Sequence, residues 1–476
     1  MRRYFLLTVY QRAKLATAAA LAAIRQPGSF VQNIAMSFSA SAGVAVLGIA
    51  LTPIISRIYP PASYGQFAVY STVVGNLLMI SLLTLPGAML LPKTQRTFIE
   101  LANALVLLTL LSVTLVSVVL VIYWRELVNY WHVPAIGSYL FLLPIAIFFT
   151  NLSSIIGSWN LRRKDFRLRA VTDMSSTLVG RGSTIGLGLL LHGASAGLML
   201  GDTINRVAHF ILLFFGGFYR EVKQFKRMFS WRGSWQAIRT YSDFPLYVLP
   251  ANYISALSTQ IPIFLLTSNF GATVVGLYSF SVSLLELPLN LVGSAVSPVF
   301  MQKATETFHT DPARLKDITL SIYNKMLYLG LLPFGFLTVF GDIIFRIAFG
   351  AKWEGAGVFT AYLGYYYVFK LTGTVTAPIY TIIQKQRYAL ISSAMLLLFR
   401  VGALLIGIAL HDVNKALLLF GVGSLLITFF TDLHILYLLK APVLLTAVRT
   451  AVLTALAIGL MWGLRMGLHT VIPQWV

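Results

Sequence analysis

Residues 243–306 read DFPLYVLPANYISALSTQIPIFLLTSNFGATVVGLYSFSVSLLELPLNLVGSAVSPVFMQKATE. Two apolar runs, 243–268 and 273–298, lie within this stretch, and a short turn containing Gly271 separates them. Each run exceeds the roughly 20 residues that a helix needs to cross a hydrocarbon core ~30 Å thick. The stretch therefore predicts a pair of membrane-spanning helices.

The second predicted helix carries a polar face. Its polar side chains recur at steps of three and four residues, which places them on one side of the helix: Ser283, Glu286, Asn290, Ser294 and Ser297. The first helix shows the same pattern more weakly, with Asn252, Ser255 and Thr259. Because a lipid-facing amide or carboxylate costs several kcal/mol, both polar faces are expected to lie against protein or water.

The composition is that of an integral membrane protein. Over 476 residues, 57% are hydrophobic and 11% are charged, whereas a soluble domain carries about 25% charged residues. The chain has no cysteine, and its seven histidines are scattered singly. We therefore expect no disulfide, no cysteine nucleophile and no metal site, and we predict no cofactor.

Short sequence words in the opening stretch resemble the seventh and eighth helices of bacterial oligosaccharide flippases. They are P-L-Y-x-L-P, Q-I-P-I-F-L-L, F-G-A-T-x-x-G-L-Y-S and L-P-L-N-L-V-G-S-A-V-S-P-V-F. Two more words are similar to that family: R-I-Y-P-P-A-S-Y-G-Q-F-A at 57–68 and F-G-A-K-W-E-G-A-G at 349–357. Such flippases belong to the multidrug, oligosaccharidyl-lipid and polysaccharide exporter superfamily, whose members move lipid-linked sugars across the bacterial inner membrane.

The resemblance implies a flippase that is not an enzyme. Its substrate would be a polyprenyl-pyrophosphate-linked oligosaccharide, carried across the inner membrane by alternating access for O-antigen, exopolysaccharide or capsule assembly. The implied partners are the lipid bilayer and polysaccharide polymerase or assembly proteins.

Apolar runs repeat along the whole chain and predict twelve spans. They lie at 34–56, 66–91, 101–123, 138–160, 170–191, 195–216, 243–268, 273–298, 319–341, 356–383, 388–410 and 415–438, with a candidate thirteenth at 444–464. With the amino terminus in the cytoplasm, most of the 36 Lys and Arg residues fall in cytoplasmic segments, as the positive-inside rule requires. The formal charge of +21 is then explained without a nucleic-acid partner.

The spans divide into two halves of six. We predict an all-α polytopic membrane protein whose two six-helix lobes are related by a pseudo-two-fold axis along the membrane normal, because each half begins inside and has an even number of spans. The predicted segments are an amphipathic cytoplasmic segment at 1–33, an N-lobe at 34–216, a basic cytoplasmic connector at 217–242, a C-lobe at 243–440 and a C-terminal segment at 441–476.

Ionisable residues inside the predicted spans are candidates for substrate contact. Each costs at least about 2.5 kcal/mol at the bilayer centre, so each should face a partner or a wet cavity. Lys370 and Arg400 have no apparent acidic partner in the sequence, so a pyrophosphate or an acidic sugar is the expected counter-ion, and the alternative is an ion pair that the sequence does not reveal. The predicted contacts of the translocation cavity are Arg181, Arg206, Lys325, Lys370, Arg400, Asn252 and Asn290.

Three carboxylates are candidates for proton coupling: Glu286, Asp202 and Asp173. Glu286 reads as a lone carboxylate in mid-span, where desolvation favours the neutral form and where it could exchange a proton as the lobes rock. A hydrogen bond to Asn290, to Ser283 or to a facing helix would instead hold it without a proton cycle. Asp202 and Arg206 are four residues apart, so the alternative for them is an ion pair that fixes helix packing.

Two other transporters remain as alternatives, a lipid II flippase and a cation-coupled multidrug antiporter of the same superfamily. Lipid II flippases place cations in the first two helices and the eighth, whereas here those first spans have only Arg57, at their outer edge, and the eighth is acidic. A site for organic cations favours carboxylates and aromatic rings. The candidate site charges inside the predicted spans of the second half are instead mostly cationic. A membrane enzyme is disfavoured because no long connector carries paired carboxylates.

Overall fold

A computed structural model describes residues 30–130 and 134–471. These residues are helical almost throughout and contain no strand. Most of the predicted cytoplasmic segment 1–33 lies outside the described residues, and the rest of it forms the first turn of helix α2.

The first half of the chain forms the N-terminal helices, by which we mean α2–α7. They are α2 (Phe30–Ile58), α3 (Pro61–Ser81), α4 (Gln95–Tyr130), α5 (Leu142–Arg162), α6 (Phe166–Leu190) and α7 (Ser195–Phe215), with the 3-10 turns η1 (Leu85–Ala88) and η2 (Pro134–Phe141). Local sequence explains several starts. Pro61 opens α3, where a missing N–H costs nothing, and the carboxylate of Asp165 accepts a hydrogen bond from Leu168 N at the start of α6.

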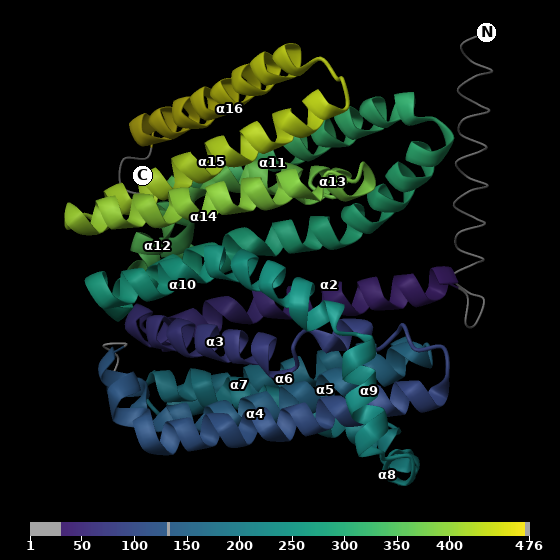
Figure 1. The fold of residues 1–476 in the computed structure, drawn as a ribbon. Helices are drawn as coiled ribbons and strands as arrows, with labels where there is room; N and C mark the ends of the chain where they lie inside the picture. Colours follow the sequence, from purple (N-terminus) through teal and green to yellow (C-terminus); the bar gives the residue numbers. More distant parts are fainter. Residues whose placement is uncertain (1–29, 131–133, 472–476) are drawn as a thin grey trace.

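A basic connector follows. It contains η3 (Phe218–Arg220), α8 (Val222–Arg227) and α9 (Trp231–Thr240), all within the predicted connector 217–242. Helix α9 packs against α4 and leaves Trp231 and Trp235 exposed. In Figure 1, α8 and α9 project from the side of the N-terminal helices.

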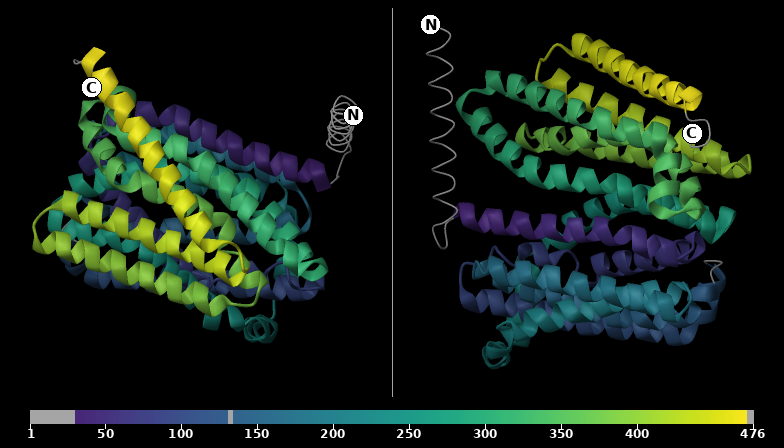
Figure 2. Two further views of the ribbon diagram at one scale, coloured as in Figure 1. Left: turned by 90° about the horizontal axis from the view of Figure 1, so that it is seen from above. Right: turned by 180° about the vertical axis from the view of Figure 1, so that it is seen from behind.

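The second half of the chain forms the C-terminal helices, α10–α16. They are α10 (Leu249–Thr310), α11 (Leu315–Phe349), α12 (Glu354–Thr376), α13 (Ile379–Ile382), α14 (Gln386–Ala409), α15 (Val413–Leu438) and α16 (Val443–Val471), with the short turns η4 (Phe244–Val248), η5 (Pro312–Arg314) and η6 (Ala351–Trp353). Figure 1 shows the two groups of helices on either side of the contact between α3 and α10. Figure 2 shows α16 lying obliquely across the other C-terminal helices, where it packs on α11 and α15.

The predicted glycine turn between the two opening runs is confirmed. Gly271 has φ +82°, a conformation that suits glycine, and the chain reverses there. The helix then continues past Pro288 and Pro298 as far as Thr310, so the second run extends further than predicted.

Two predicted runs end differently from the expectation. The run at 66–91 is wrong beyond Ser81, because Leu83 and Thr84 take positive φ values and break the helix. The run at 356–383 is wrong beyond Thr376, where α12 ends and the short α13 begins after Pro378.

Eight helical segments of the described chain are long and apolar enough to cross a membrane. They lie at 95–126, 137–162, 195–215, 244–293, 312–349, 386–409, 413–438 and 443–469. The segment 244–293 contains the Gly271 break, and 443–469 includes the candidate thirteenth span. Four other predicted runs fall on α2, α3, α6 and α12, outside this set.

Candidate functional site

Three of the six sequence words meet at one end of the molecule, in what we call the motif contact: residues 56–68, 270–280 and 349–357. Trp353, which is fully buried, donates a hydrogen bond from Nε1 to Ser56 O at 2.8 Å. Its ring centroid lies 4.9 Å from that of Tyr64 and 4.1 Å from that of Phe280. Lys352 Nζ donates to Arg57 O at 2.9 Å. The N-terminal and C-terminal helices are thus sealed together here.

Helices α3 and α10 approach closely within the motif contact because both carry glycine there. A Cβ on Gly65 would lie 1.8 Å from Ala272 O, and one on Gly276 would lie 1.8 Å from Pro61 O. Further along the same pair of helices, Asn76 Nδ2 donates to Gln260 Oε1. Any larger side chain at either glycine would therefore force the helices apart.

A second feature, the inter-half cavity, has a volume of about 500 Å³. It is lined by Ala45 of α2, by Thr374 of α12 and by residues of the word L-P-L-N-L-V-G-S-A-V-S-P-V-F on α10, including Asn290 and Ser297. Ser297 Oγ donates to Thr374 O at 3.1 Å. The predicted contact Asn290 is therefore exposed to a cavity between the two groups of helices.

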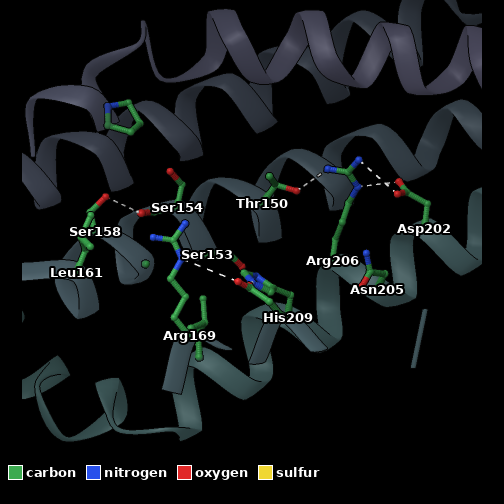
Figure 3. Close-up of a pocket in the computed structure, with 14 residues that line it drawn as sticks. Thr150, Ser153, Ser154, Ser158, Leu161, Arg169, Asp202, Asn205, Arg206 and His209 are labelled. Carbon is green, nitrogen blue, oxygen red and sulfur yellow. Dashed lines mark hydrogen bonds and ion pairs between the residues drawn. The ribbon is translucent and has the colours of Figure 1, made fainter. Parts of the chain in front are cut away.

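A third feature, the polar cavity, lies among α5, α6 and α7 and has a volume of about 600 Å³ (Figure 3). Arg206 Nε donates to Asp202 Oδ2 at 2.7 Å, and Arg206 Nη1 donates to Thr150 Oγ1 at 2.9 Å. The two charged side chains keep about a fifth of their surface exposed. The predicted ion pair of α7 is confirmed, and it lines this cavity.

The same cavity holds a second set of charges. His209 Nε2 lies 3.0 Å from Asp173 Oδ1, and Arg169 Nε lies 4.0 Å from Asp173 Oδ2. Ser153 Oγ and Asn205 Oδ1 also line the cavity, buried and without a hydrogen-bond partner in the described part of the chain. The accessible polar groups of the cavity are therefore the paired charges, and the two unpaired oxygens lie buried in its wall.

Sequence reasoning missed these serines. Ser153, Ser154 and Ser158 share one face of α5, together with Thr150 one turn earlier. That spacing was visible in the sequence. It carried little weight because serine and threonine are common in membrane helices, where they can bond to their own backbone, as Ser158 does to Ser154 O.

Glu286 and Lys370 form an ion pair, so the prediction that each lacks a partner is wrong. Glu286 Oε1 also accepts a hydrogen bond from the hydroxyl of Tyr367. The two residues lie on α10 and α12, more than 80 positions apart, and no local sequence pattern could join them. Glu286 is not bonded to Asn290 or Ser283 among the hydrogen bonds of the described residues.

Arg400 is buried without a carboxylate in the described structure, as the sequence indicated. Its guanidinium donates instead to Ser424 Oγ, Ser258 Oγ and Ser258 O at 3.0–3.2 Å, and to the hydroxyl of Tyr366. It also lies 4.9 Å from the ring centroid of Phe420. The cavity that it shares with Glu286 and Lys370 has a volume of about 30 Å³, which is room for about one water and not for a sugar.

The other predicted contacts are scattered. Arg181 is half-buried on α6 beside Gly48 of α2, and it forms no ion pair within the described residues. Lys325 on α11 and Asn252 on α10 are exposed. Their contact with a substrate stays a prediction.

The described residues contain no group of three or more His, Asp or Glu side chains placed to hold a metal ion. The site consists of two cavities, one enclosed by the N-terminal helices and one between the halves, with a sealed contact at one end.

A family model described as "Polysaccharide biosynthesis protein" matches residues 54–357, well over half of the chain, and the protein belongs to this family. The succinoglycan biosynthesis transport protein ExoT of Rhizobium meliloti (strain 1021) is 23% identical over 325 residues, which is 68% of this chain and 63% of that protein. The amylovoran biosynthesis protein AmsL of Erwinia amylovora is 23% identical over 264 residues, which is 53% of this chain and 62% of that protein. The chain thus spans less than two thirds of the length of these relatives.

Solved structures share the fold. The lipid II flippase MurJ in an inward closed conformation has a TM-score of 0.62 at 12% identity, covering 91% of this chain and 99% of that one. An inward-facing multidrug resistance MATE family transporter of the MOP superfamily has a TM-score of 0.57 at 15% identity, covering 88% and 98%. At these identities the likeness shows the fold alone, which this chain shares with both proteins.

Proposed function

We propose that this protein is a flippase for polyprenyl-pyrophosphate-linked oligosaccharides used in bacterial surface polysaccharide assembly, and that it is not an enzyme. The observation that carries the proposal is the position of the sequence words. Those around Tyr64, Gly276 and Trp353 form the motif contact, and the word around Asn290 lines the inter-half cavity. The residues shared with oligosaccharide flippases therefore lie where two halves of a transporter would separate.

The physical problem of such a flippase is to carry a hydrophilic glycan and a charged pyrophosphate through hydrocarbon. A polar cavity replaces the lost hydration with hydroxyls, amides and cations, while the polyprenyl tail stays in lipid. We infer that the motif contact closes the outer end in this conformation and that the cavities open toward the cytoplasm. Arg57 and Lys352 lie in the motif contact. The positive-inside rule places both residues in external segments, which contain fewer Lys and Arg residues than the cytoplasmic segments.

For the topology, we propose twelve core spans in two six-helix lobes related by a pseudo-two-fold axis, at 34–216 and 243–440, with α16 as a thirteenth span. The amino terminus lies in the cytoplasm and the protein in the inner membrane. Reporter fusions after Lys226 and Lys316 should give a cytoplasmic signal, and a fusion after Lys352 an external one. An external signal at Lys226 contradicts the lobe assignment.

The substrate contacts that we propose are in two places. Arg206 and the unpartnered Ser153 face the polar cavity, and Asn290 faces the inter-half cavity. Arg181 stands close to α2 and has no carboxylate partner in the described chain, so it is the cation best placed to meet a pyrophosphate. Lys370 and Arg400 would reach a substrate only after the C-terminal helices rearrange, because they now face a cavity of about 30 Å³.

The deciding experiment is the location of lipid-linked glycan in cells that lack the protein. A flippase predicts accumulation on the cytoplasmic leaflet, reversed by the wild-type gene and not by an Arg206→Ala variant at matched membrane levels. Accumulation on the outer leaflet would indicate a missing polymerase. An unchanged location of the lipid-linked glycan together with increased drug sensitivity would indicate an antiporter. Loss of peptidoglycan synthesis would indicate a lipid II flippase.

A further inference from the structure

Asp432 is a fully buried carboxyl group that the proposed transport cavities do not use. It lies on α15, six residues before the helix ends, and faces α12. Thr372 Oγ1 lies 2.5 Å from Asp432 Oδ2, and Thr376 Oγ1 is hydrogen-bonded to Asp432 Oδ1. Asp432 falls within the predicted span 415–438.

No cation balances this carboxyl group in the described structure. The carboxylates that the sequence offers for proton coupling all have one: Asp202 has Arg206, Asp173 has Arg169, and Glu286 has Lys370. The nearby charges of α12 and α14 are already engaged, Lys370 by Glu286 and Arg400 by hydroxyl groups. An ionised carboxylate in a dry interior without a partner is costly, and the usual outcome is that it takes up a proton.

The hydrogen-bond geometry accommodates that proton. Thr372 Oγ1 lies 2.8 Å from Phe369 O, and Thr376 Oγ1 lies 3.2 Å from Thr372 O, in addition to their contacts with the carboxyl group. Two hydroxyl hydrogens cannot serve four acceptors. A proton on Oδ2 of Asp432 could donate to Thr372 Oγ1, which then donates to Phe369 O, while Thr376 donates to Oδ1. Three hydrogens then satisfy the three shortest contacts.

Within the described chain, two phenols lie near enough to Asp432 to feel its charge, Tyr323 of α11 and Tyr380 of α13. Tyr323 shares a hydrogen bond with Thr450 of α16, and the Tyr380 hydroxyl lies 2.8 Å from Nδ1 of His434, a half-buried residue near the end of α15. Tyr380 and His434 therefore lie between the buried carboxyl group and the end of the helix.

We propose that Asp432 is a proton-binding site, loaded in this conformation, and that its loss of a proton accompanies the conformational cycle. The coupling to transport rests on the proposed function, whereas the proton site does not. Helix α12 supplies Thr372 and Thr376 to this site and Lys370 to the ion pair with Glu286 on α10. An ionised Asp432 would keep both threonine hydroxyls as donors but would lack a counter-ion, so its charge would favour a shift of α12 relative to α15 that admits water or a cation, and α10 would move with α12.

Infrared spectroscopy of the purified protein tests the site without any transport assay. In wild-type protein labelled with ¹³C at aspartate carboxyl groups, we expect an isotope-shifted band of a protonated carboxyl group at neutral pH. Asp432→Asn should remove that band, and the matched variant Glu286→Gln should keep it. Because the wild-type spectrum already decides whether a protonated aspartate exists, a folding defect in Asp432→Asn would not hide the answer.

Absence of the band at neutral pH overturns the proposal, as does its survival in folded Asp432→Asn protein. Sodium is the competing ion. A rise in the melting temperature of wild-type protein on adding NaCl, absent with choline chloride and absent in Asp432→Asn, would make the site a sodium site and equally overturn the proposal. A missing band together with glycan trapped on the cytoplasmic leaflet of knockout cells would leave the flippase function standing.

Discussion

The polar cavity among α5–α7 and the interior between α12 and α15 keep charges inside the helix bundle in different ways. In the polar cavity, Asp202 and Asp173 each lie beside a basic side chain and border a volume of about 600 Å³. In the interior, Arg400 and Asp432 lack an opposite charge within the described chain and are held by hydroxyl groups. The first arrangement can exchange partners with a ligand, whereas in the second the charged groups depend on hydroxyl groups of the packed helices.

The largest expected effect is on stability, at Arg400. Arg400→Ala removes a buried guanidinium and leaves the hydroxyls of Ser258, Ser424 and Tyr366 without it, so we expect a loss of about 3 kcal/mol or more. Thermal unfolding in detergent measures this, with exposed Lys325→Ala as control, for which the change should stay within roughly 0.5 kcal/mol. An Arg400→Ala protein as stable as the wild type would contradict the idea that buried charges are more costly to disturb in the interior than in the polar cavity.

The next effect is on transport, at Arg206. Arg206→Ala breaks the ion pair with Asp202, which borders the polar cavity. Because water can take the place of the lost guanidinium there, the melting temperature of the Arg206→Ala protein should fall less than that of the Arg400→Ala protein. Export of glycan should fall about tenfold to a hundredfold if the guanidinium contacts substrate. Export is measured at matched membrane levels. Full export by Arg206→Ala would leave the pair with a packing role.

A smaller effect is expected at Ser153, whose hydroxyl has no partner in the described structure. Ser153→Ala should leave stability unchanged or raise it by up to about 1 kcal/mol, and should reduce export. The matched control is Ser63→Ala, because buried Ser63 donates to Gly193 O at 2.8 Å. That variant should lose about 1 kcal/mol. Unchanged export in Ser153→Ala would exclude this hydroxyl from the substrate site.

The smallest effect is expected at Asp412, the residue preceding α15, outside the proposed span. Backbone hydrogen bonding from Lys415 N lowers its pKa below the ordinary value. Because the folded pKa is the lower one, this stabilisation is present above the ordinary value and is lost as the pH falls below it. The melting-temperature difference between wild type and Asp412→Ala should therefore shrink between about pH 6 and pH 3, and Asp412→Asn should show less pH dependence. A constant difference would contradict the assignment.

The sequence alone determined the class of the molecule, because each of these features is local. Runs of some 20 apolar residues must be helices in a membrane, and the glycine turn at Gly271, the basic connector and the ion pair of Asp202 with Arg206 follow from short spacings. The sequence words likewise indicated the family before their positions in space were known. Local patterns failed where a positive φ at Thr84 broke a long apolar run.

Only the tertiary structure decided which charges are paired. Glu286 and Lys370 are 84 positions apart, and Asp432 lies 60 positions from Thr372, so their contacts depend on how α10, α12 and α15 pack. This packing decided the surroundings of two carboxyl groups: Glu286, which the sequence presented as unpaired, has a cation, and Asp432 has none in the described structure. The physical reason is that burial and pairing are properties of several helices together, whereas a sequence pattern reports the faces of one helix at a time.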